Sequence, residues 1–504
     1  MLTRRGFAAG VGALGTFGLL ADGMCADSSV HAALPPLAAG TRPKLKIGVL
    51  SDIHFHPLSV SPSKRDIFEK ALLFCRDEGV DGVLIPGDLI TDGETEAMEL
   101  VAETWFKVFP GDRGADGRPV ARLFLLGNHD CAGRCMRLPE YKGRLQNPDV
   151  KAKWFYLDRA RHWERIWHEK YEPIFYKEVN GYKFILRNWI AGHLGDKDTL
   201  PDFMERHGAE LAGEKPFFFA QHPHPKGTCC QSWTDSGAAP WIDCSDDGRS
   251  TEILSGFPNC IALSGHSHTT LTDEHTIWQG AFTSVGCSCL GGYAFMFPGR
   301  ENGQAHDDFK QITPRPMTMP KLAFTASKQG MMMDVYDDRI VFRRREFNTD
   351  LPLGADWVVP LPSPGAKPYA FAPRREAAAA HPPQFLPGAK IKVVEKRLPD
   401  RANEEKDMAV VTFPSIPSRD GAMRAFDFAV RAETRIGDCT RTLVEKRVYS
   451  PGMLRPEELD KDDASCTFAK EELALNRDVR FIVTPLDCWG NCGKPIFSDW
   501  RRFK

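Results

Sequence analysis

Residues 124 to 130 read FLLGNHD, an apolar run followed by glycine, asparagine, histidine and aspartate. Asn, His and Asp are not good strand formers, yet they directly follow a run with the composition of a buried strand. In a parallel sheet that is covered on both faces, strands are near-continuous apolar runs, and their carboxyl ends carry the ligand-binding residues. The stretch therefore predicts a buried strand that delivers polar side chains to a site.

Four other stretches repeat this arrangement: KIGVLSDIH at 46–54, GVLIPGD at 82–88, FFFAQHPH at 217–224 and CIALSGHSH at 260–268. Short runs rich in Val, Ile, Leu and Phe, some of them separated by helical patterns, are typical of βαβ units. The spacing predicts one helix within residues 63–80, with Ser63 as its N-cap and Gly79 as its stop, and another over 94–108. We therefore expect an α/β fold in which the polar strand ends converge.

The chain has 504 residues, more than one ordinary hydrophobic core accommodates, so about two or three domains are expected. Its hydrophobic fraction of 42% and its charged fraction of 26% are those of a soluble globular protein. A net charge of −2 argues against nucleic acid or an anionic membrane as the main partner, because such partners select a basic excess. The sequence leaves the oligomeric state open.

The amino terminus carries Thr3, Arg4, Arg5 and Phe7 ahead of a weakly apolar Ala/Gly/Leu stretch. Twin arginines before such a stretch are typical of a Tat export signal, and the stretch is too short and glycine-rich for a stable membrane span. Residues 1–32 are therefore expected to be a Tat signal peptide, and the mature protein is expected to be periplasmic or otherwise exported.

Fourteen cysteines suit an oxidising compartment. Close pairs occur at Cys131/Cys135, Cys229/Cys230, Cys287/Cys289 and Cys488/Cys492. Because none of them forms two CxxC halves, we expect loop disulfides or buried thiols rather than a zinc site.

Two segments of the first domain have hairpin patterns. Residues 131–180 are an aromatic-rich insertion, which reads as a helix followed by a hairpin that turns at Asn180 and Gly181. The run at 331–347 predicts another hairpin, which turns near Asp337.

The composition shifts predict a linker over 33–43, a catalytic domain over 44–350, a Pro-rich linker over 351–390 and a second domain over 391–504. In the last segment, roughly seven short alternating runs in about a hundred residues predict an antiparallel β-sandwich. That segment resembles a fibronectin type III domain, chiefly in its closing stretch RFIVTPLDCWGNCGKPIFSDW.

The strand ends carry eight chemically active residues: Asp52, His54, Asp88, Asn128, His129, His222, His266 and His268. Carboxylate, imidazole and amide oxygen together suit borderline divalent metals such as Zn, Mn or Fe. So many ligands are too many for one tetrahedral zinc and are about right for two neighbouring metal ions. The sequence therefore predicts a dinuclear metal site.

The ordered set SDIH, GD, GNHD, QHPH and GHSH resembles the calcineurin-like metallophosphoesterases, over roughly residues 44–350. The resemblance implies an αβ(β)α sandwich. It further implies that one metal is held by Asp52, His54 and His268, the other by Asn128, His222 and His266, with Asp88 bridging them. By the same resemblance, His129 stands free of the metals and faces the phosphate.

Hydrolysis of a phosphate ester needs a nucleophile at neutral pH and a way to hold anionic oxygens. Two metal ions roughly 3.5–4 Å apart provide both, because they lower the pKa of bound water and clamp the displacement. A hydroxide that bridges the ions would attack phosphorus, and His129 would protonate the leaving oxygen or stabilise its charge. Asp130 or Asp92 could orient His129.

Arg134 could contact a phosphate, and His224, which lies close enough to His222 to be confused with it, is a second substrate-binding candidate. Three tryptophans could stack on a base or sugar: Trp233, Trp241 and Trp278. The tyrosine that purple acid phosphatases carry three residues after the GD aspartate is Thr91 here. Nothing in the sequence separates monoester from diester substrates.

Two other functions compete with the hydrolase. One is a non-catalytic scaffold on the same fold, but such proteins usually lose ligands that are all present here. The other is a cell-surface glycan-binding protein that acts through its C-terminal sandwich.

Overall fold

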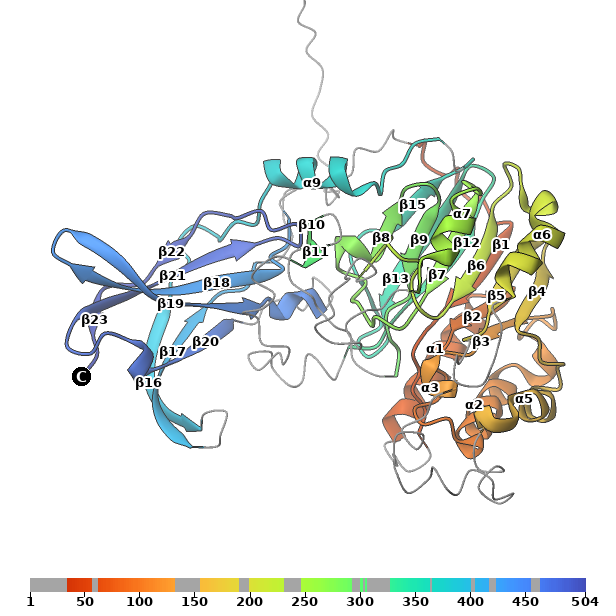
Figure 1. The fold of residues 1–504 in the computed structure, drawn as a ribbon, viewed down its shortest axis with the longest axis horizontal. Coiled ribbons are helices and arrows are strands. Elements are labelled where there is room, and N and C mark those ends of the chain that lie inside the picture. Colours follow the sequence, from red (N-terminus) through yellow and green to blue (C-terminus); the bar gives the residue numbers. More distant parts are fainter. Residues whose placement is uncertain are drawn as a thin grey trace, which may run out of the picture.

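A computed structural model describes residues 34–56, 62–131, 155–189, 199–230, 246–291, 300–301, 304–305, 327–362, 365–399, 404–416, 423–454 and 463–504. Two bodies lie side by side in Figure 1, an α/β body on the right and an all-β body on the left. No helix in these ranges is both long and apolar enough to cross a membrane.

The first sheet of the α/β body has the order β14-β13-β12-β1-β2-β3, with β15 also paired to β13. Its strands are β1 (Leu45–Val49), β2 (Gly82–Pro86), β3 (Ala121–Leu125), β12 (Gln329–Val335), β13 (Arg339–Glu346), β14 (Leu351–Pro352) and β15 (Trp357–Pro360). The first three are parallel, and β12 adds to β1 in the antiparallel sense. The expected hairpin that turns near Asp337 is β12–β13.

The second sheet has the order β4-β5-β6-β7-β9-β8. Its strands are β4 (Ile174–Val179), β5 (Tyr182–Arg187), β6 (Phe217–Gln221), β7 (Cys260–Ser264), β8 (Ile277–Gln279) and β9 (Thr283–Gly286). The four central strands are parallel and the two edge strands are antiparallel to them. The turn of the β4–β5 hairpin is made by Asn180 and Gly181 at φ 49° and 74°, as predicted.

Alternation along the strands of the second sheet shows how the layers stack. In β6, Phe218 and Ala220 join the core cluster that also contains the first sheet, whereas Phe217 and Phe219 join the cluster under the outer helices. Successive side chains of a strand point to opposite faces, so the second sheet is covered on both sides. The two sheets therefore face each other and form the inner layers of an αββα sandwich.

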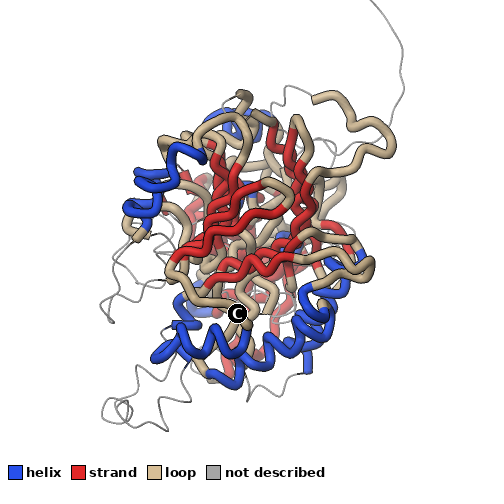
Figure 2. The backbone as a smooth tube through the Cα atoms, turned by 90° about the vertical axis from the view of Figure 1, so that its right-hand side faces the viewer, coloured by secondary structure: helices blue, strands red, loops and turns tan. Residues whose placement is uncertain are grey.

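Helices cover the outer faces of both sheets (Figure 2). They are α1 (Pro62–Asp77), α2 (Thr95–Val108) and α5 (Arg159–Trp167) around the first sheet, and α6 (Leu200–Leu211) and α7 (Arg249–Leu254) on the second. The helix α1 begins at Pro62, so Ser63 lies inside it and is not its N-cap. The chain leaves α1 at Gly79, which has φ 70°, as the sequence predicted.

The all-β body is a sandwich of two antiparallel sheets. One sheet contains β16 (Lys392–Pro399), β17 (Glu405–Phe413) and β20 (Ala464–Ala469). The other contains β18 (Asp427–Ile436), β19 (Cys439–Tyr449), β21 (Asp478–Leu486), β22 (Ile496–Phe497) and β23 (Arg501–Arg502). Both contribute to one core, in which Val411 and Phe468 of the first sheet join Val430 and Phe481 of the second. The predicted all-β domain is therefore present.

The Pro-rich segment 351–390 was expected to be a linker, and over part of its length this is wrong. Strand β15 pairs with β13 and buries Trp357 completely, and Tyr369 is also fully buried. Within the same segment, α9 (Phe371–Ala380) lies between the two bodies (Figure 1). Apolar side chains spaced between the prolines explain the difference, because they add an edge to the first sheet.

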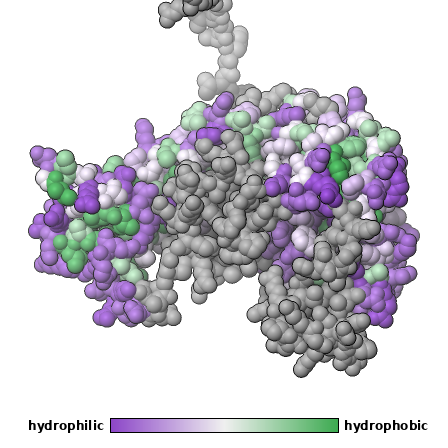
Figure 3. Space-filling model, viewed as in Figure 1, coloured by the Kyte–Doolittle hydropathy of each residue, from purple (hydrophilic) through white to green (hydrophobic). Residues whose placement is uncertain are grey.

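The all-β body docks on the loop that follows β7. The Thr270 hydroxyl donates a hydrogen bond to the carbonyl oxygen of Met453 at 3.2 Å, and the ring of His275 lies 4.1 Å from that of Trp489. The face in Figure 3 is mostly hydrophilic where residues are described, with hydrophobic residues in small patches. The loop after β7 also carries His266 and His268, two of the predicted metal ligands. The second domain therefore contacts and supports a loop of the site.

Candidate metal centre

The carboxyl ends of β1, β2 and β3 in one sheet meet those of β6 and β7 in the other. The backbone N–H of His266 donates to the Asp52 carboxylate at 3.2 and 3.1 Å, across 214 residues of sequence. The predicted convergence of strand ends from distant parts of the chain is thus present, and it occurs between sheets as well as within them.

The first group of side chains consists of Asp52, His54 and His268. Their ligand atoms all lie within 4.8 Å of one another. The two imidazole Nε2 atoms are 3.1 Å apart, and the His268 Nε2 lies 2.9 Å from Asp52 Oδ1. Three ligand atoms converge here on a space of the size of one cation.

The second group consists of Asp88, His222 and His266, whose ligand atoms also lie within 4.8 Å of one another. The Asp88 Oδ2 is 3.1 Å from His222 Nε2 and 3.7 Å from His54 Nε2, which belongs to the first group. Asp88 therefore lies between the two groups, where a shared carboxylate would have to lie.

Two buried ligand atoms of the cluster make no hydrogen bond: Asn128 Oδ1 and His222 Nε2, the second of which faces the Asp88 carboxylate at 3.1 Å. The His222 Nδ1 donates to the carbonyl oxygen of Pro86 at 2.7 Å, so the Nε2 lone pair is directed into the cluster. A buried acceptor such as Asn128 Oδ1 is costly without a partner, and a metal ion would satisfy it and take the place of the proton on His222 Nε2. The residues present fit a pair of divalent cations.

The electrostatics of the cluster agree with this fit. Burial lowers the pKa of His222, but the carboxylates of Asp88 and Asp52 outweigh burial and raise the pKa to about 9. Burial lowers the pKa values of His54 and His266 to about 3. Burial raises the pKa of Asp52, but the neighbouring imidazoles outweigh it and lower the pKa to about 2. The Asp52 and Asp88 carboxylates thus stay charged and need nearby positive charge, whereas burial and the charge of Asp88 raise the pKa of Asp130 to about 8.

The backbone at the ligands is strained. Asp52, His54, Asp88, His266 and His268 all have positive φ, between 50° and 66°. Side-chain-bearing residues rarely adopt this left-handed conformation, which costs on the order of 1–3 kcal/mol each and clusters at functional sites. Hydrogen bonds between loops hold it, such as that from His54 N to Asp88 O at 3.0 Å. The rest of the fold offsets this backbone strain, and the strained backbone orients the ligand side chains toward the cluster.

The glycines of the motifs allow close approach between these loops. A Cβ on Gly127 would lie 2.2 Å from Asp88 Oδ1, and one on Gly265 would lie 2.4 Å from Asp52 Oδ2. No real Cβ fits at such distances, so each glycine lets a neighbouring strand end reach the carboxylate.

His129 stands at the edge of the cluster. Its ring lies 4.8 Å from that of His54 in an edge-on arrangement, and its backbone N–H donates to Asp88 Oδ1 at 2.9 Å. The Nδ1 lies 2.7 Å from the carbonyl oxygen of Thr91. A carbonyl can only accept, so Nδ1 carries a proton and Nε2 is left for other chemistry.

Neither aspartate that was expected to orient His129 does so. The fully buried Asp130 carboxylate accepts hydrogen bonds from the backbone N–H groups of Gly127, Ile90 and Leu89 at 2.7, 2.8 and 3.3 Å. Asp92 Oδ2 lies 3.0 Å from His56 Nε2. The Asp130 carboxylate thus joins the loops after β2 and β3, and the backbone carbonyl of Thr91 orients His129.

His224, the second substrate-binding candidate, lies beneath the surface of the site. His224 is fully buried, with Nε2 at 2.9 Å from Ser267 Oγ and Nδ1 at 3.4 Å from Cys229 Sγ. Both ring nitrogens face protein atoms, so the side chain offers nothing to a substrate. Trp278 packs on Phe282 beneath the outer helices and is not in the centre. Three further candidates lie outside the described residues: Arg134, Trp233 and Trp241.

Sequence reasoning missed residues that support the centre. The Trp189 ring lies 6.1 Å from His266 and 6.4 Å from His222, and Cys289 Sγ donates to the carbonyl oxygen of Asp52 at 3.1 Å. The backbone N–H of Gly291 also donates to this carbonyl, at 3.0 Å. These residues follow no motif, and only the polar and aromatic run RNW at 187–189 could have hinted at Trp189.

Comparison with known proteins agrees with this geometry. Residues 45–270 match the profile of the Calcineurin-like phosphoesterase family, and all the residues of both groups lie inside the match. No curated protein sequence matches the chain.

Among solved structures, the chain is similar to a dimetal phosphatase from Danio rerio, at 11% identity and TM-score 0.33, covering 63% of this chain and 99% of that one. It is also similar to a predicted phosphoesterase from Streptococcus pneumoniae, at 13% identity and TM-score 0.23, covering 63% and 97%. A third is Vacuolar Protein Sorting 29 from Cryptosporidium parvum, at 12% identity and TM-score 0.25, covering 62% and 96%.

The family match and the two ligand groups together define residues 45–270 as a calcineurin-like phosphoesterase domain. The protein is accordingly a metallophosphoesterase, a hydrolase that acts on phosphate esters.

Proposed function

We propose that this domain hydrolyses small phosphate monoesters or diesters with the help of two divalent metal ions. One ion would be held by Asp52, His54 and His268, the other by Asn128, His222 and His266, and Asp88 would contact both. The observation that carries the proposal is the pair of buried ligand groups whose atoms lie within 4.8 Å, with Asp88 between them. Mn, Zn and Fe all suit this mixture of imidazole, carboxylate and amide ligands.

When bound, two such cations lower the pKa of a bound water and hold the oxygens of a phosphate. The chain supplies the proton chemistry. The Thr91 carbonyl keeps Nδ1 of His129 protonated, so Nε2 is the atom that would take up a second proton and, from the imidazolium form, pass it to the leaving oxygen. The strained loops hold the ligands in place before substrate arrives, which reduces the reorganisation that the reaction requires.

A panel of phosphomonoesters and phosphodiesters tests this proposal on the purified chain reconstituted with Mn, Zn or Fe. Metal content is measured on the same samples. We expect turnover that follows occupancy of two ions and is lost when a chelator removes them. Turnover at full rate in metal-free protein would contradict the proposal.

The variant Asp88→Asn separates a shared carboxylate from a ligand of one ion. It should lower occupancy at both positions, because the amide loses the charge that both cations need. The exposed Asp116→Asn, on the loop before β3, is the matched control and should retain both ions. Full occupancy in Asp88→Asn would remove Asp88 from its bridging role.

We also propose that residues 1–32 are a Tat signal and that the mature protein is periplasmic or exported. The twin arginines Arg4 and Arg5 support this. Expression in bacteria with and without a functional Tat system tests it. An unprocessed chain that stays in the cytosol of both strains would contradict export.

We also propose that residues 391–504 form a second unit, a fibronectin type III-like sandwich, and that the first unit begins at residue 44 and extends past 350 to include β14 and β15, which pair with β13. The two facing antiparallel sheets support this assignment.

A further inference from the structure

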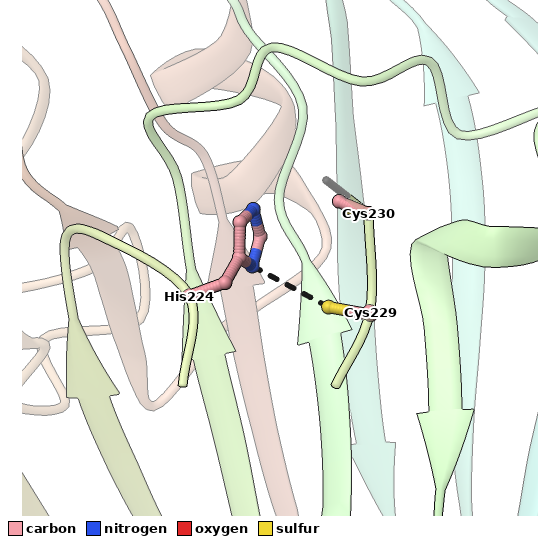
Figure 4. A group of neighbouring side chains, drawn as sticks. All are labelled: His224, Cys229 and Cys230. Carbon is pink, nitrogen blue, oxygen red and sulfur yellow. Dashed lines mark hydrogen bonds between the residues drawn. The ribbon is translucent and has the colours of Figure 1, made fainter. Parts of the chain in front are cut away.

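A second cluster of metal-binding side chains lies on the segment that follows β6. It consists of His224, Cys229 and Cys230, and their ligand atoms all lie within 4.8 Å of one another. Figure 4 shows the His224 ring turned toward the two cysteines, with a dashed line to Cys229. All three side chains are buried, at 0%, 0% and 2% exposure.

The spacing suits a cation between these atoms. The His224 Nδ1 lies 3.4 Å from Cys229 Sγ. Tetrahedral zinc with Zn–N near 2.0–2.1 Å and Zn–S near 2.3 Å places its nitrogen and sulfur ligands about 3.5 Å apart. The observed separation is therefore close to that of ligands around one zinc ion.

The surroundings hold the ligands in this orientation. Ser267 Oγ lies 2.9 Å from His224 Nε2 and can accept its proton, which leaves the Nδ1 lone pair facing the sulfurs. Ser284 Oγ lies 3.4 Å from Cys229 Sγ and adds an oxygen beside the cluster.

A glycine also leaves room for the second sulfur. A Cβ on Gly286 would lie 2.6 Å from Cys230 Sγ and 3.4 Å from the His224 ring. Only glycine at this position, at the end of β9, lets the thiol and the imidazole share the space.

We propose that His224, Cys229 and Cys230 bind one Zn²⁺ ion, separate from the dinuclear centre. Two thiolates and an imidazole are ligands that zinc prefers, and the buried position suits a structural ion. The sequence favoured loop disulfides or buried thiols here, because the spacing lacks two CxxC halves. The fold adds what the spacing lacked, since it turns His224 back onto the cysteine pair.

The ion would fix the position of two ligand loops of the dinuclear centre. His224 follows His222 by two residues, and its partner Ser267 lies between His266 and His268. The three zinc-binding residues would thus act as positioning residues for the centre, without contact with substrate.

Cobalt substitution tests the proposal without any need for turnover. Thiolate ligands give Co²⁺ an intense charge-transfer absorption, which a centre of only nitrogen and oxygen ligands lacks. The full chain, loaded with Co²⁺ under reducing conditions, should show this band, and zinc alone should displace it. X-ray absorption of the zinc-loaded chain should show sulfur scatterers in the zinc shell.

The variants Cys229→Ser and Cys230→Ser should each weaken or abolish the band and bind one metal fewer per chain. Cys260→Ser is the matched control, because Cys260 is equally buried in β7 but belongs to none of the metal-binding groups found among the described residues. It should keep the band. Loss of the band in the Cys229 and Cys230 variants with retained hydrolysis would still support the zinc site.

Three results would overturn the proposal. The first is a wild-type chain that shows no charge-transfer band and no zinc–sulfur scattering. The second is a band that persists in the double variant Cys229→Ser/Cys230→Ser. The third is a disulfide at these two cysteines, found by mass spectrometry in protein isolated without reductant. X-ray absorption uses only the wild-type chain, so the test stands even if a variant does not fold.

Discussion

The Nδ1 atom of His129 lies 2.7 Å from the carbonyl oxygen of Thr91, so the backbone of the loop after β2 sets the orientation of this histidine in the short helix α3 (Asn128–Cys131). Thr91 also bonds through its hydroxyl to the His54 carbonyl at 2.8 Å. Thr91 therefore links His129 to the loop that carries His54. Its contact with His129 is made by a backbone carbonyl, which no side-chain substitution removes.

Replacement of His129 by alanine should lower turnover on a good substrate by roughly 10²–10⁴-fold, the usual contribution of general acid–base help. Both metals should remain, since His129 is expected to stand free of them. Turnover and metal content are measured together. The control His207→Ala changes a surface histidine paired with Glu210 and should leave turnover unchanged. Equal turnover in wild type and His129→Ala would remove the proton role.

Asp130→Asn should destabilise the fold by about 1–3 kcal/mol, because an amide cannot accept hydrogen bonds at both ends. The carboxylate now accepts from backbone N–H groups on two loops through both oxygens. Chemical denaturation measures the free energy of unfolding. If Asp130 instead relayed protons to His129, turnover would fall with no loss of stability, and the loop-tying role would be refuted.

Gly127→Ala should reduce metal binding and activity together. Its Cβ would lie 2.2 Å from Asp88 Oδ1 and 2.5 Å from Asp88 N, so the carboxylate between the two ligand groups must move. Gly256→Ala is the control, because its Cβ would meet only the Ile253 carbonyl at an ordinary 3.5 Å. Titration with Mn²⁺ compares the two variants. Unaltered affinity in Gly127→Ala would mean that Asp88 is not held where the structure has it.

Metal uptake should release protons at neutral pH. The carboxylates of Asp88 and Asp52 outweigh burial and raise the pKa of His222 to about 9, and the Cys289 sulfur together with the Asp52 carboxylate outweighs burial and raises the pKa of His268 well above its usual value. A metal must displace these protons, so apparent affinity should rise with pH up to about 9. Calorimetry in buffers of different ionisation enthalpy counts the protons released. An affinity that is flat between pH 6.5 and 9 would contradict this account.

The raised pKa of His222 also predicts that the metal-free protein becomes less stable as the pH rises, whereas its metal affinity increases. A histidine whose folded pKa lies above its unfolded value of 6.5 binds more protons when folded. Its contribution to stability is complete below pH 6.5 and is lost as the pH rises through about 9. Thermal unfolding of chelator-treated protein across this range measures the effect, and stability that increases with pH would refute it.

Trp489→Ala should loosen the all-β body from the loop after β7. The indole is 4% exposed and packs at a tilt against His275 and edge-on against Phe371, so its removal should cost about 3–5 kcal/mol. Hydrogen exchange at residues 269–276 should increase. The control Trp500→Ala lies elsewhere in the same body, where Trp500 contacts Arg435 and Arg480. Unchanged exchange in Trp489→Ala would show that docking does not depend on this contact.

Much of the fold was readable from local pattern. Five apolar runs that end in Asp or His predicted buried parallel strands, and the structure confirms β1, β2, β3, β6 and β7 at these places. The αββα layering also follows from resemblance to a known family. The Pro-rich segment was misread because spaced apolar residues such as Trp357 and Val359 leave no periodic signal, although they complete a sheet edge.

The candidate site likewise has features that the sequence predicted and features that it did not. That Asp52, Asp88 and His266 would come together was determined by sequence, because each directly follows a buried strand and parallel strands end at one edge. The roles of Asp130 and His224 were not, because the partners of these side chains lie up to 41 and 43 residues away along the chain. A motif predicts which residue lies at the end of a strand but does not predict the direction of its side chain.

The sequence by itself therefore determined the class of chemistry: the order of strands and the kinds of ligand atoms at their ends are local properties of the chain. The tertiary structure decided which nitrogen of His129 is held by a carbonyl, which aspartate ties loops together, and that His224 meets Cys229 and Cys230. These outcomes depend on distances between loops that are distant in sequence, and only the packing of the two sheets against each other sets those distances.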